Sequence, residues 1–521
     1  MRWFGNARRL SALAAALLVL AACGGGGGGG AEPAGPPTST PLGPGENALD
    51  DPTAYSTAAN ASLPGATEAH AVTRHGIVLD GATLPYTARA GHLVARHPVS
   101  GAAEAAFFHV SYLAEGADPA TRPVTFFYNG GPGSSSIWLH LGSFGPKRLA
   151  TNAPSTSTPT PFPLVDNAES MLAISDLVFV DAIGTGHSQA IAPNTNQSFW
   201  GVDADAAVFR DFVVRWLDAH GRNASPTFLF GESYGTVRTA VLANLLESAG
   251  VALQGIVLQS SVLNYGSNCG VTGDSGCGGY FPSYGETGAW HGRTVPLQAD
   301  ADAYADTLRS YTLATYEPVL VQWFSAQTPP DTVTASQMQA LTGWPEASWR
   351  ANPNLSPGTF RFNLMPNVLL GRYDARMSAA HGSSLAQDGD PSSAFISTQF
   401  AAAIGPYLRD TLHYRNNSPY VTLGGAIQTW DFSHDGAGLP DAVPDLAAAM
   451  AQNPQLKVLA VSGYHDLATP FHQTEKDLAR LGANPNVIVR NYPGGHMTYL
   501  DDATRVKQLN DLRTFYREAL Q

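Results

Sequence analysis

The sequence is poor in charged residues, and lysine is the scarcest of them. Charged residues make up 14% of the 521-residue chain, against the ~25% usual for soluble domains. Lysine occurs only at positions 147, 457, 476 and 507, and acidic residues outnumber basic ones by 42 to 29. The formal net charge is therefore −13. Because a nucleic-acid-binding protein needs a basic face to neutralise phosphates, we expect no nucleic-acid partner.

Cysteine is nearly absent as well. The chain has three cysteines, Cys23, Cys269 and Cys277, and the last two are close together with glycines between them. In an oxidising compartment such a near pair closes a small disulfide loop. A metal site would need further Cys or His at fixed short spacing, which this stretch lacks. We therefore expect a disulfide there, and neither a metal nor another cofactor.

Long apolar runs are missing after the N-terminus. Residues 10–22 are small and apolar, follow a leader with three arginines, and are too few for the ~20 residues of a membrane-spanning helix. This pattern is typical of a signal peptide. The run ends L-A-A-C, which resembles a bacterial lipobox and implies cleavage before Cys23 and attachment of lipid to its sulfur.

Residues 1–22 are accordingly expected to be a lipoprotein signal peptide, and Cys23 the anchor of an exported protein. An ordinary secretory signal with an incidental cysteine is the alternative. Residues 23–65, rich in Gly and Pro, are expected to be a flexible linker. The glycine after Cys23, where aspartate often retains lipoproteins at the inner membrane, favours the outer membrane facing the periplasm. Nothing in the sequence indicates an oligomeric state.

The remaining chain reads as an α/β fold. Its 44% hydrophobic residues exclude wholesale disorder. Short apolar runs without alternation are expected of strands buried on both faces of a mainly parallel sheet, and helical stretches separate them. The clearest runs are residues 124–128, 177–180, 227–230, 255–258, 456–461 and 487–490. We expect helices on both faces of this sheet.

One long stretch, residues 264–424, breaks the rhythm of strands and helices. It has glycine-rich loops followed by helix-like segments, and core strands resume after it. We interpret it as a mostly helical cap inserted over the carboxyl edge of the sheet. The core is then expected in two parts, residues 66–263 and 425–521.

A G-x-S-x-G sequence, G-E-S-Y-G, lies directly after one expected strand and before an expected helix. Glycines at these positions permit a sharp turn that lifts the hydroxyl of Ser233 clear of the sheet. A serine hydroxyl becomes a nucleophile when a histidine takes its proton and a carboxylate orients that histidine. Asp466 and His496 follow later expected strands in the order Ser, Asp, His that this architecture uses.

A second glycine-rich turn, N-G-G-P-G-S-S, begins at Asn129 after an earlier strand. Its glycines leave room for a backbone N–H to face a developing oxyanion. We expect the N–H groups of Gly131 and Tyr234 to form the oxyanion hole. A phosphate-binding loop is the rival interpretation, but the turn lacks the G-K-[ST] ending.

These three motifs, with G-H-M around His496, resemble the signatures of the serine carboxypeptidase family. The resemblance implies an α/β-hydrolase fold with a cap, a Ser233–Asp466–His496 triad, and Asn129 and Glu232 as ligands of the substrate's C-terminal carboxylate. A second family glutamate is replaced by Ser143. Arg238 is a conceivable substitute donor, although a surface salt bridge is the more ordinary role.

The resemblance thus predicts a secreted serine carboxypeptidase that acts on peptides through an acyl-enzyme. Two alternatives stay open. The first is an esterase or acyltransferase on the same scaffold, because fold and triad do not determine the leaving group. The second is a non-catalytic binding lipoprotein, against which the complete Ser–Asp–His set argues.

Overall fold

A computed structural model of the chain describes residues 42–272 and 275–521. The expected signal peptide and Cys23 lie outside these residues. Among the helices that are described, none is both long and apolar enough to span a membrane.

The core is a ten-stranded sheet. At one side of the sheet the strands pair antiparallel with their neighbours, and the six strands at the other side pair with one another in parallel. The mainly parallel sheet predicted from the sequence is confirmed. In spatial order the strands are β2 (His70–Leu79), β3 (Ala82–Arg96), β4 (Ala103–Ala114), β8 (Asp176–Val180), β5 (Val124–Tyr128), β10 (Thr227–Glu232), β11 (Leu253–Gln259), β15 (Lys457–Gly463) and β16 (Val487–Tyr492), with β9 (Gln189–Ala190) beside β4.

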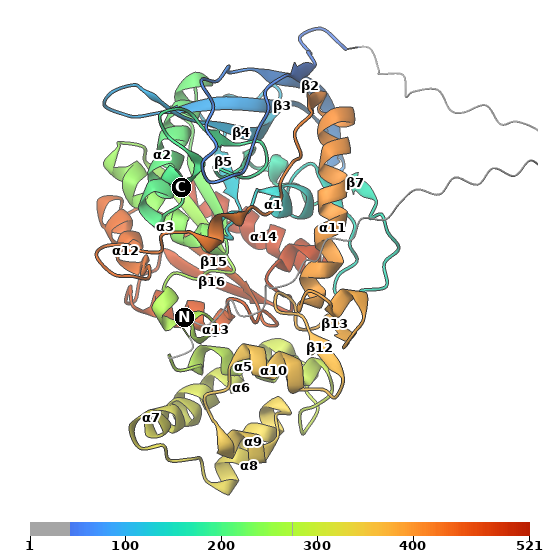
Figure 1. Cartoon of the computed structure of the whole chain (residues 1–521), viewed down its shortest axis with the longest axis vertical. Coiled ribbons are helices and arrows are strands. Elements are labelled where there is room, and N and C mark those ends of the chain that lie inside the picture. Colours follow the sequence, from blue (N-terminus) through green and yellow to red (C-terminus); the bar gives the residue numbers. More distant parts are fainter. Residues whose placement is uncertain (1–41, 273–274) are drawn as a thin grey trace, which may run out of the picture. The chain divides into compact units, whose positions relative to one another are not determined.

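Helices cover both faces of the sheet, which explains why its central strands lack polar alternation. In β10, Leu229 packs into the core on one face, while Phe228 and Phe230 pack into the core on the other. Removing one such buried phenyl ring typically costs about 3–5 kcal/mol. One face carries α2 (Val202–Ala219), α3 (Tyr234–Ser248) and α12 (Val443–Gln452), and the other α1 (Ile137–Gly142), α11 (Pro391–Pro406) and α14 (Asp502–Ala519) (Figure 1).

A group of helices lies between β11 and β15 in the chain and has an aromatic core of its own, built around Phe281, Tyr316 and Trp349. In Figure 1 this group lies at the opposite end of the fold from β2 and β3. Its helices are α5 (Phe281–Trp290), α6 (Ala301–Tyr311), α7 (Glu317–Ala326), α8 (Thr332–Thr342), α9 (Glu346–Ala351) and α10 (Pro357–Asn363).

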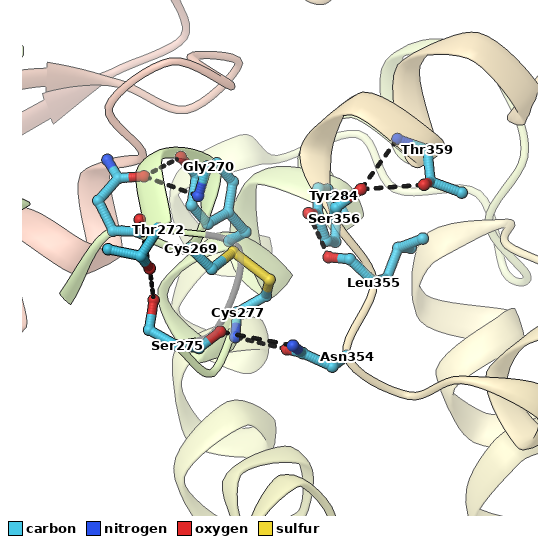
Figure 2. The surroundings of a disulfide bond; sticks show 12 residues. Cys269, Gly270, Thr272, Ser275, Cys277, Tyr284, Asn354, Leu355, Ser356 and Thr359 are labelled. Atoms are coloured by element: carbon cyan, nitrogen blue, oxygen red, sulfur yellow. Dashed lines mark hydrogen bonds between the residues drawn. A yellow bond between two sulfur atoms is a disulfide. The ribbon is translucent and has the colours of Figure 1, made fainter. Parts of the chain in front are cut away.

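A disulfide closes the loop that leads into this helical group (Figure 2). Cys269 and Cys277 are bonded with an S–S length of 2.10 Å. The backbone N–H of Cys277 donates to Asn354 Oδ1 at 2.9 Å, so the closed loop is also tied to the segment that precedes α10. Shorter elements complete the fold: β1 (Leu49–Asp51), β6 (Lys147–Leu149), β7 (Leu164–Asp166), β12 (Val368–Leu370), β13 (Ser378–Ala380), β14 (Tyr414–Asn416), α4 (Cys269–Thr272) and α13 (Phe471–Ala479).

The last part of the expected linker, residues 42–65, is held against the folded chain. β1 pairs in parallel with β14, and the hydroxyl of Tyr414 donates to Asp51 at 2.9 Å. Leu63 is 4% exposed, and its backbone N–H bonds to the Ala190 carbonyl. Composition alone does not reveal such docking, because a few apolar and acidic side chains with distant partners determine it.

Candidate active site

Ser233 occupies a sharp turn between β10 and α3. It has φ +61°, in the left-handed region that non-glycine residues seldom adopt, at a cost of about 1–3 kcal/mol. The glycine before Glu232 is required by close packing, because a Cβ on Gly231 would lie 2.2 Å from the hydroxyl oxygen of Thr239. The turn predicted from the G-x-S-x-G sequence is therefore present, and strain is concentrated on the serine.

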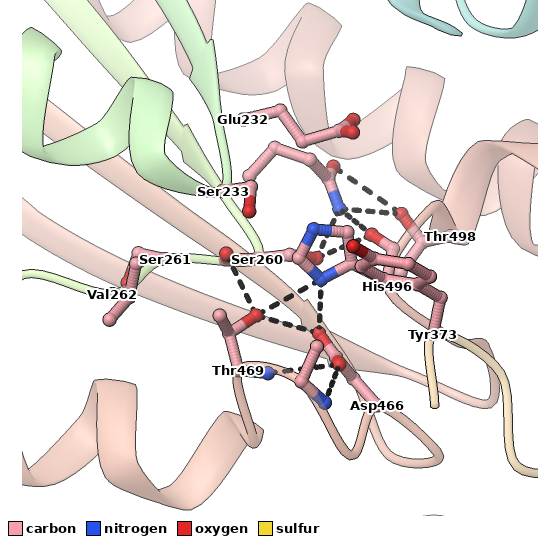
Figure 3. A network of polar contacts seen from close by, with 12 residues as sticks. Glu232, Ser233, Ser260, Ser261, Val262, Tyr373, Asp466, Thr469, His496 and Thr498 are labelled. Carbon is pink, nitrogen blue, oxygen red and sulfur yellow. Dashed lines mark hydrogen bonds and ion pairs between the residues drawn. The ribbon is translucent and has the colours of Figure 1, made fainter. Parts of the chain in front are cut away.

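Asp466 and His496 lie in the loops that follow β15 and β16, and they are bonded to each other (Figure 3). His496 Nδ1 is 2.7 Å from Asp466 Oδ2. The other carboxylate oxygen accepts the backbone N–H groups of Ala468 and Thr469 at 2.7 and 3.0 Å, and the Thr469 hydroxyl donates to Oδ2 at 2.7 Å. With its Nδ1–H donated to this fixed carboxylate, the imidazole presents Nε2 as a proton acceptor.

Ser233 and His496 line the same cavity, of about 210 Å³. Figure 3 shows the Ser233 hydroxyl on the side of the imidazole opposite Asp466. Within the described residues, this hydroxyl forms no hydrogen bond to the protein. Hydrogen bonds between catalytic groups often tighten only when substrate is bound, so this geometry suits a ligand-free site.

The position and the charge of His496 are set by different neighbours. Its carbonyl accepts the Ser260 hydroxyl at 2.5 Å, and its backbone N–H donates to the Tyr373 carbonyl at 2.6 Å. Burial lowers the pKa of His496, but the Asp466 carboxylate, with a smaller contribution from Glu232, outweighs it and holds that pKa above the ordinary value. The imidazole can therefore keep a proton that it takes from Ser233.

The two expected oxyanion donors belong to loops that touch. A Cβ on Gly130 would lie 2.4 Å from the backbone nitrogen of Tyr234, so only glycine lets the second glycine-rich turn approach the start of α3 this closely. Among the described residues, neither the N–H of Gly131 nor that of Tyr234 donates to a protein acceptor. Two unpaired N–H groups beside a nucleophile are what an oxyanion hole requires.

Asn129 and Glu232 form a buried pair that lines the same cavity as Ser233. Asn129 Nδ2 donates to Glu232 Oε1 at 2.9 Å, and the Tyr499 hydroxyl donates to Glu232 Oε2 at 2.6 Å. Burial raises the pKa of Glu232 to about 7, against the opposing influence of His496 and of both hydrogen bonds. Near neutral pH this carboxyl group is therefore poised between its protonated and ionised forms.

Ser143, the departure from the family pattern, forms no hydrogen bond to Glu232 in the described part of the chain. Its hydroxyl donates to the Leu139 carbonyl at 2.5 Å, and the residue is completely buried. Tyr499 and Asn129 are the residues that hydrogen-bond Glu232. Tyr499 could not be found from the sequence, because a tyrosine three positions after His496 carries no motif and its partner lies 267 residues away.

Arg238 is neither a surface residue nor a cavity donor. Its side chain is fully buried, with two hydrogen bonds to Asp205 at 2.7 and 3.2 Å. Its Nη1 donates to the Asn129 carbonyl at 2.8 Å. The surface salt bridge considered in the sequence analysis is wrong. Arg238 instead positions the backbone of Asn129 at the start of the second glycine-rich turn.

Comparison with known proteins connects part of the chain to one family. The serine carboxypeptidase family model matches residues 81–269. In Arabidopsis thaliana, serine carboxypeptidase-like 16 is 27% identical over 168 residues, which are 30% of this chain and 36% of the relative. Serine carboxypeptidase-like 41 is 28% identical over 200 residues, 36% of this chain and 39% of the relative. The chain thus spans under half the length of these relatives, and the predicted resemblance to the family is confirmed.

A solved structure extends the likeness in fold. KEX1(delta)p, a prohormone-processing carboxypeptidase from Saccharomyces cerevisiae, has a TM-score of 0.52 and 13% identity, over 83% of this chain and 91% of that one. With the strand order above, this likeness confirms the predicted α/β-hydrolase fold. Asp466 and His496 lie beyond the residues that the family model matches. Their place beside Ser233 is an independent observation.

Proposed function

We propose that this chain, which resembles the serine carboxypeptidases over residues 81–269, is a serine-type carboxypeptidase that releases C-terminal amino acids from peptides. One observation carries the proposal. A buried carboxyl group with a pKa of about 7, on Glu232, lines the same cavity as Ser233 and His496. When it is protonated, this group can donate a hydrogen bond to a substrate carboxylate, whereas an ionised one would repel it.

The proposed reaction has two halves. Ser233 Oγ attacks the last peptide carbonyl while His496 Nε2 takes its proton, and the oxyanion faces the N–H groups of Gly131 and Tyr234. His496 then passes the proton to the leaving nitrogen, the C–N bond breaks, and the C-terminal amino acid departs. Water, deprotonated by His496, hydrolyses the remaining ester on Ser233 and restores the serine.

The wall of the cavity supports a preference for apolar side chains next to the cleaved bond. It combines aromatic and aliphatic groups with the polar groups of the site. The apolar side chains are Trp138, Tyr373, Ile396, Leu423 and Met497.

Export and anchoring complete the proposal. The Cys269–Cys277 disulfide suits an oxidising compartment outside the cytosol. We propose that lipid on Cys23 holds the enzyme at the outer membrane, facing the periplasm. Labelling cells with a radioactive fatty acid would test this, because Cys23→Ala should leave the chain unlabelled.

A panel of three substrates tests the activity. An N-blocked dipeptide with a free carboxylate should release its last amino acid, while the same dipeptide as its amide should be cleaved poorly. A simple ester without a carboxylate serves as the third substrate. Cleavage of the ester alone would exclude the carboxypeptidase and favour the esterase or acyltransferase, which the absence of the second family glutamate at Ser143 keeps in consideration.

The pH dependence of KM should identify Glu232 as the group that meets the substrate carboxylate. Below about pH 7 the carboxyl is protonated and binds, so KM for the free-acid dipeptide should rise about tenfold per pH unit above that value. Glu232→Gln should abolish this rise, because an amide donates at every pH.

The exposed Glu518→Gln provides the matched control for this experiment, and it should reproduce the wild-type profile. The ester should show no rise of KM with pH, either in the wild type or in Glu232→Gln. A rise that persists for the free-acid dipeptide in Glu232→Gln would assign carboxylate binding to another group.

A further inference from the structure

A second cavity, of about 610 Å³, lies away from Ser233, and three of its lining residues are acidic. α5 contributes Glu286 and Trp290, and the start of α6 with the segment before it contributes Asp300 and Asp302. The loops after β15 and β16 close it with His465 and Pro493. Its wall is thus continuous with the two loops that carry Asp466 and His496.

Glu286 is the unusual member of this cavity. It is 2% exposed, and its Oε1 has no hydrogen-bond partner among the described residues. His465, 3% exposed, likewise leaves Nδ1 without a partner. Buried polar groups are nearly always paired, because leaving one unpaired costs about 1–3 kcal/mol. Two unpaired polar atoms on residues that line one cavity therefore indicate a ligand that completes their hydrogen bonds.

The charges around the cavity favour a cationic ligand. Burial, together with the charges of Asp302 and Asp300, raises the pKa of Glu286 to about 8, while Arg309 opposes them. Arg309 is already engaged by Glu475 at 2.8 Å. Asp302 accepts the Tyr464 hydroxyl at 2.6 Å and lies 3.7 Å from Lys507 Nζ.

Arg376, a further cation near the cavity, is also paired with carboxylates. Arg376 forms ion pairs with Asp374 and Asp501, and its Cζ lies over the Trp290 ring, 5.5 Å from the ring centroid. In the described part of the chain no cation pairs with Glu286 or Asp300. Once Glu286 is ionised, above about pH 8, the cavity therefore has an excess of negative charge, beside an indole that is 53% exposed.

The acidic groups of this cavity do not form a cluster of three ligand atoms that could hold a metal ion. Within the described residues, only His434, Asp435 and Asp445 bring three ligand atoms close enough together to hold one, and they lie elsewhere. A ligand that reaches several separated carboxylates must be larger. A primary ammonium on a short carbon chain fits, since its chain can lie on the Trp290 ring and its charge can meet Glu286.

We propose that this cavity is a binding site for a small organic cation, with Glu286 as its counter-ion and Trp290 as its apolar wall. The same ammonium chemistry is present in a free diamine and in the lysine side chain of a peptide. The site does not depend on the proposed peptidase activity, because no residue lines both this cavity and the Ser233 cavity.

Calorimetric titration of the full chain at about pH 8.5, where Glu286 is largely ionised, tests the proposal. The probes are pentane-1,5-diamine, N-acetyl-lysine amide and the uncharged pentane-1,5-diol. At least one amine should bind and the diol should not. Glu286→Gln should weaken amine binding at least tenfold, and which amine binds more tightly identifies the source of the ligand.

Glu518→Gln, the same change at an exposed position, should bind the amines like wild type. Circular dichroism of both variants checks their folding, and Trp290→Ala, at the apolar part of the cavity, provides a second variant, expected to weaken binding. The proposal is overturned if neither amine binds, if the diol binds as well as the amines, or if Glu286→Gln leaves amine binding unchanged.

Discussion

Replacing Ser233 by alanine is expected to lower kcat for a free-acid dipeptide by about 10⁴- to 10⁶-fold, because no other group can form the acyl-enzyme. KM should change little, since the proposed contacts of Asn129 and Glu232 with the substrate carboxylate do not involve the serine hydroxyl. Labelling by a fluorophosphonate should disappear with the activity. Steady-state kinetics and mass spectrometry of the labelled protein measure the two effects.

Ser397→Ala is the matched control for Ser233→Ala. Ser397 lines the same cavity from α11, but its hydroxyl bonds to the Ser393 carbonyl one turn earlier. This variant should retain activity within about twofold and stay open to the fluorophosphonate. Full labelling of Ser233→Ala would show that a different residue is the nucleophile.

Replacing Asp466 by asparagine is expected to lower kcat by about 10⁴-fold, through the tautomer of His496. The backbone N–H groups of Ala468 and Thr469 donate to one carboxylate oxygen, so the amide oxygen of asparagine must take that place. Its NH₂ group then faces His496 Nδ1 and donates to it. The proton of the neutral imidazole moves to Nε2, which can no longer accept the proton of Ser233.

The loss from Asp466→Asn should appear in kcat across the whole pH range, while the fold is retained. Asp218→Asn, the same change at an exposed position near the end of α2, should behave like wild type. Thr469→Val separates orientation from charge, because it removes the hydroxyl that bridges Asp466 and His496. A loss below about 100-fold for Asp466→Asn would contradict the role given to Asp466.

The placement of the site could be predicted from the sequence wherever it depends on local pattern. Ser233, Asp466 and His496 each follow an apolar run that ends in a turn, and parallel strands bring such ends to one edge of the sheet. The structure places Asp466 and His496 in contact at that edge, and Ser233 and His496 on one cavity wall. Short-range rules are sufficient for this much.

What could not be predicted depends on partners far apart in the chain. Tyr499 bonds to Glu232 across 267 positions, and Asp205 holds Arg238 inside the core although arginine is usually exposed. A single sequence contains no signal for such pairs, because either side chain would be equally stable in water until the fold brings them together. The docking of β1 on β14 escaped prediction for the same reason.

The long stretch between β11 and β15 also determines when, during synthesis, the proposed catalytic residues are all present. Residues 260–456 must be translated after Ser233 and before β15 and β16, which the loops with Asp466 and His496 follow. At about 5–20 residues per second this takes roughly 10–40 s. During that time Ser233 has neither His496 nor Asp466, so we expect an unfinished or shortened chain to lack the proposed hydrolase activity. The proposed nucleophile is therefore made early, and the proposed base and carboxylate are added only after the last two strands of the sheet.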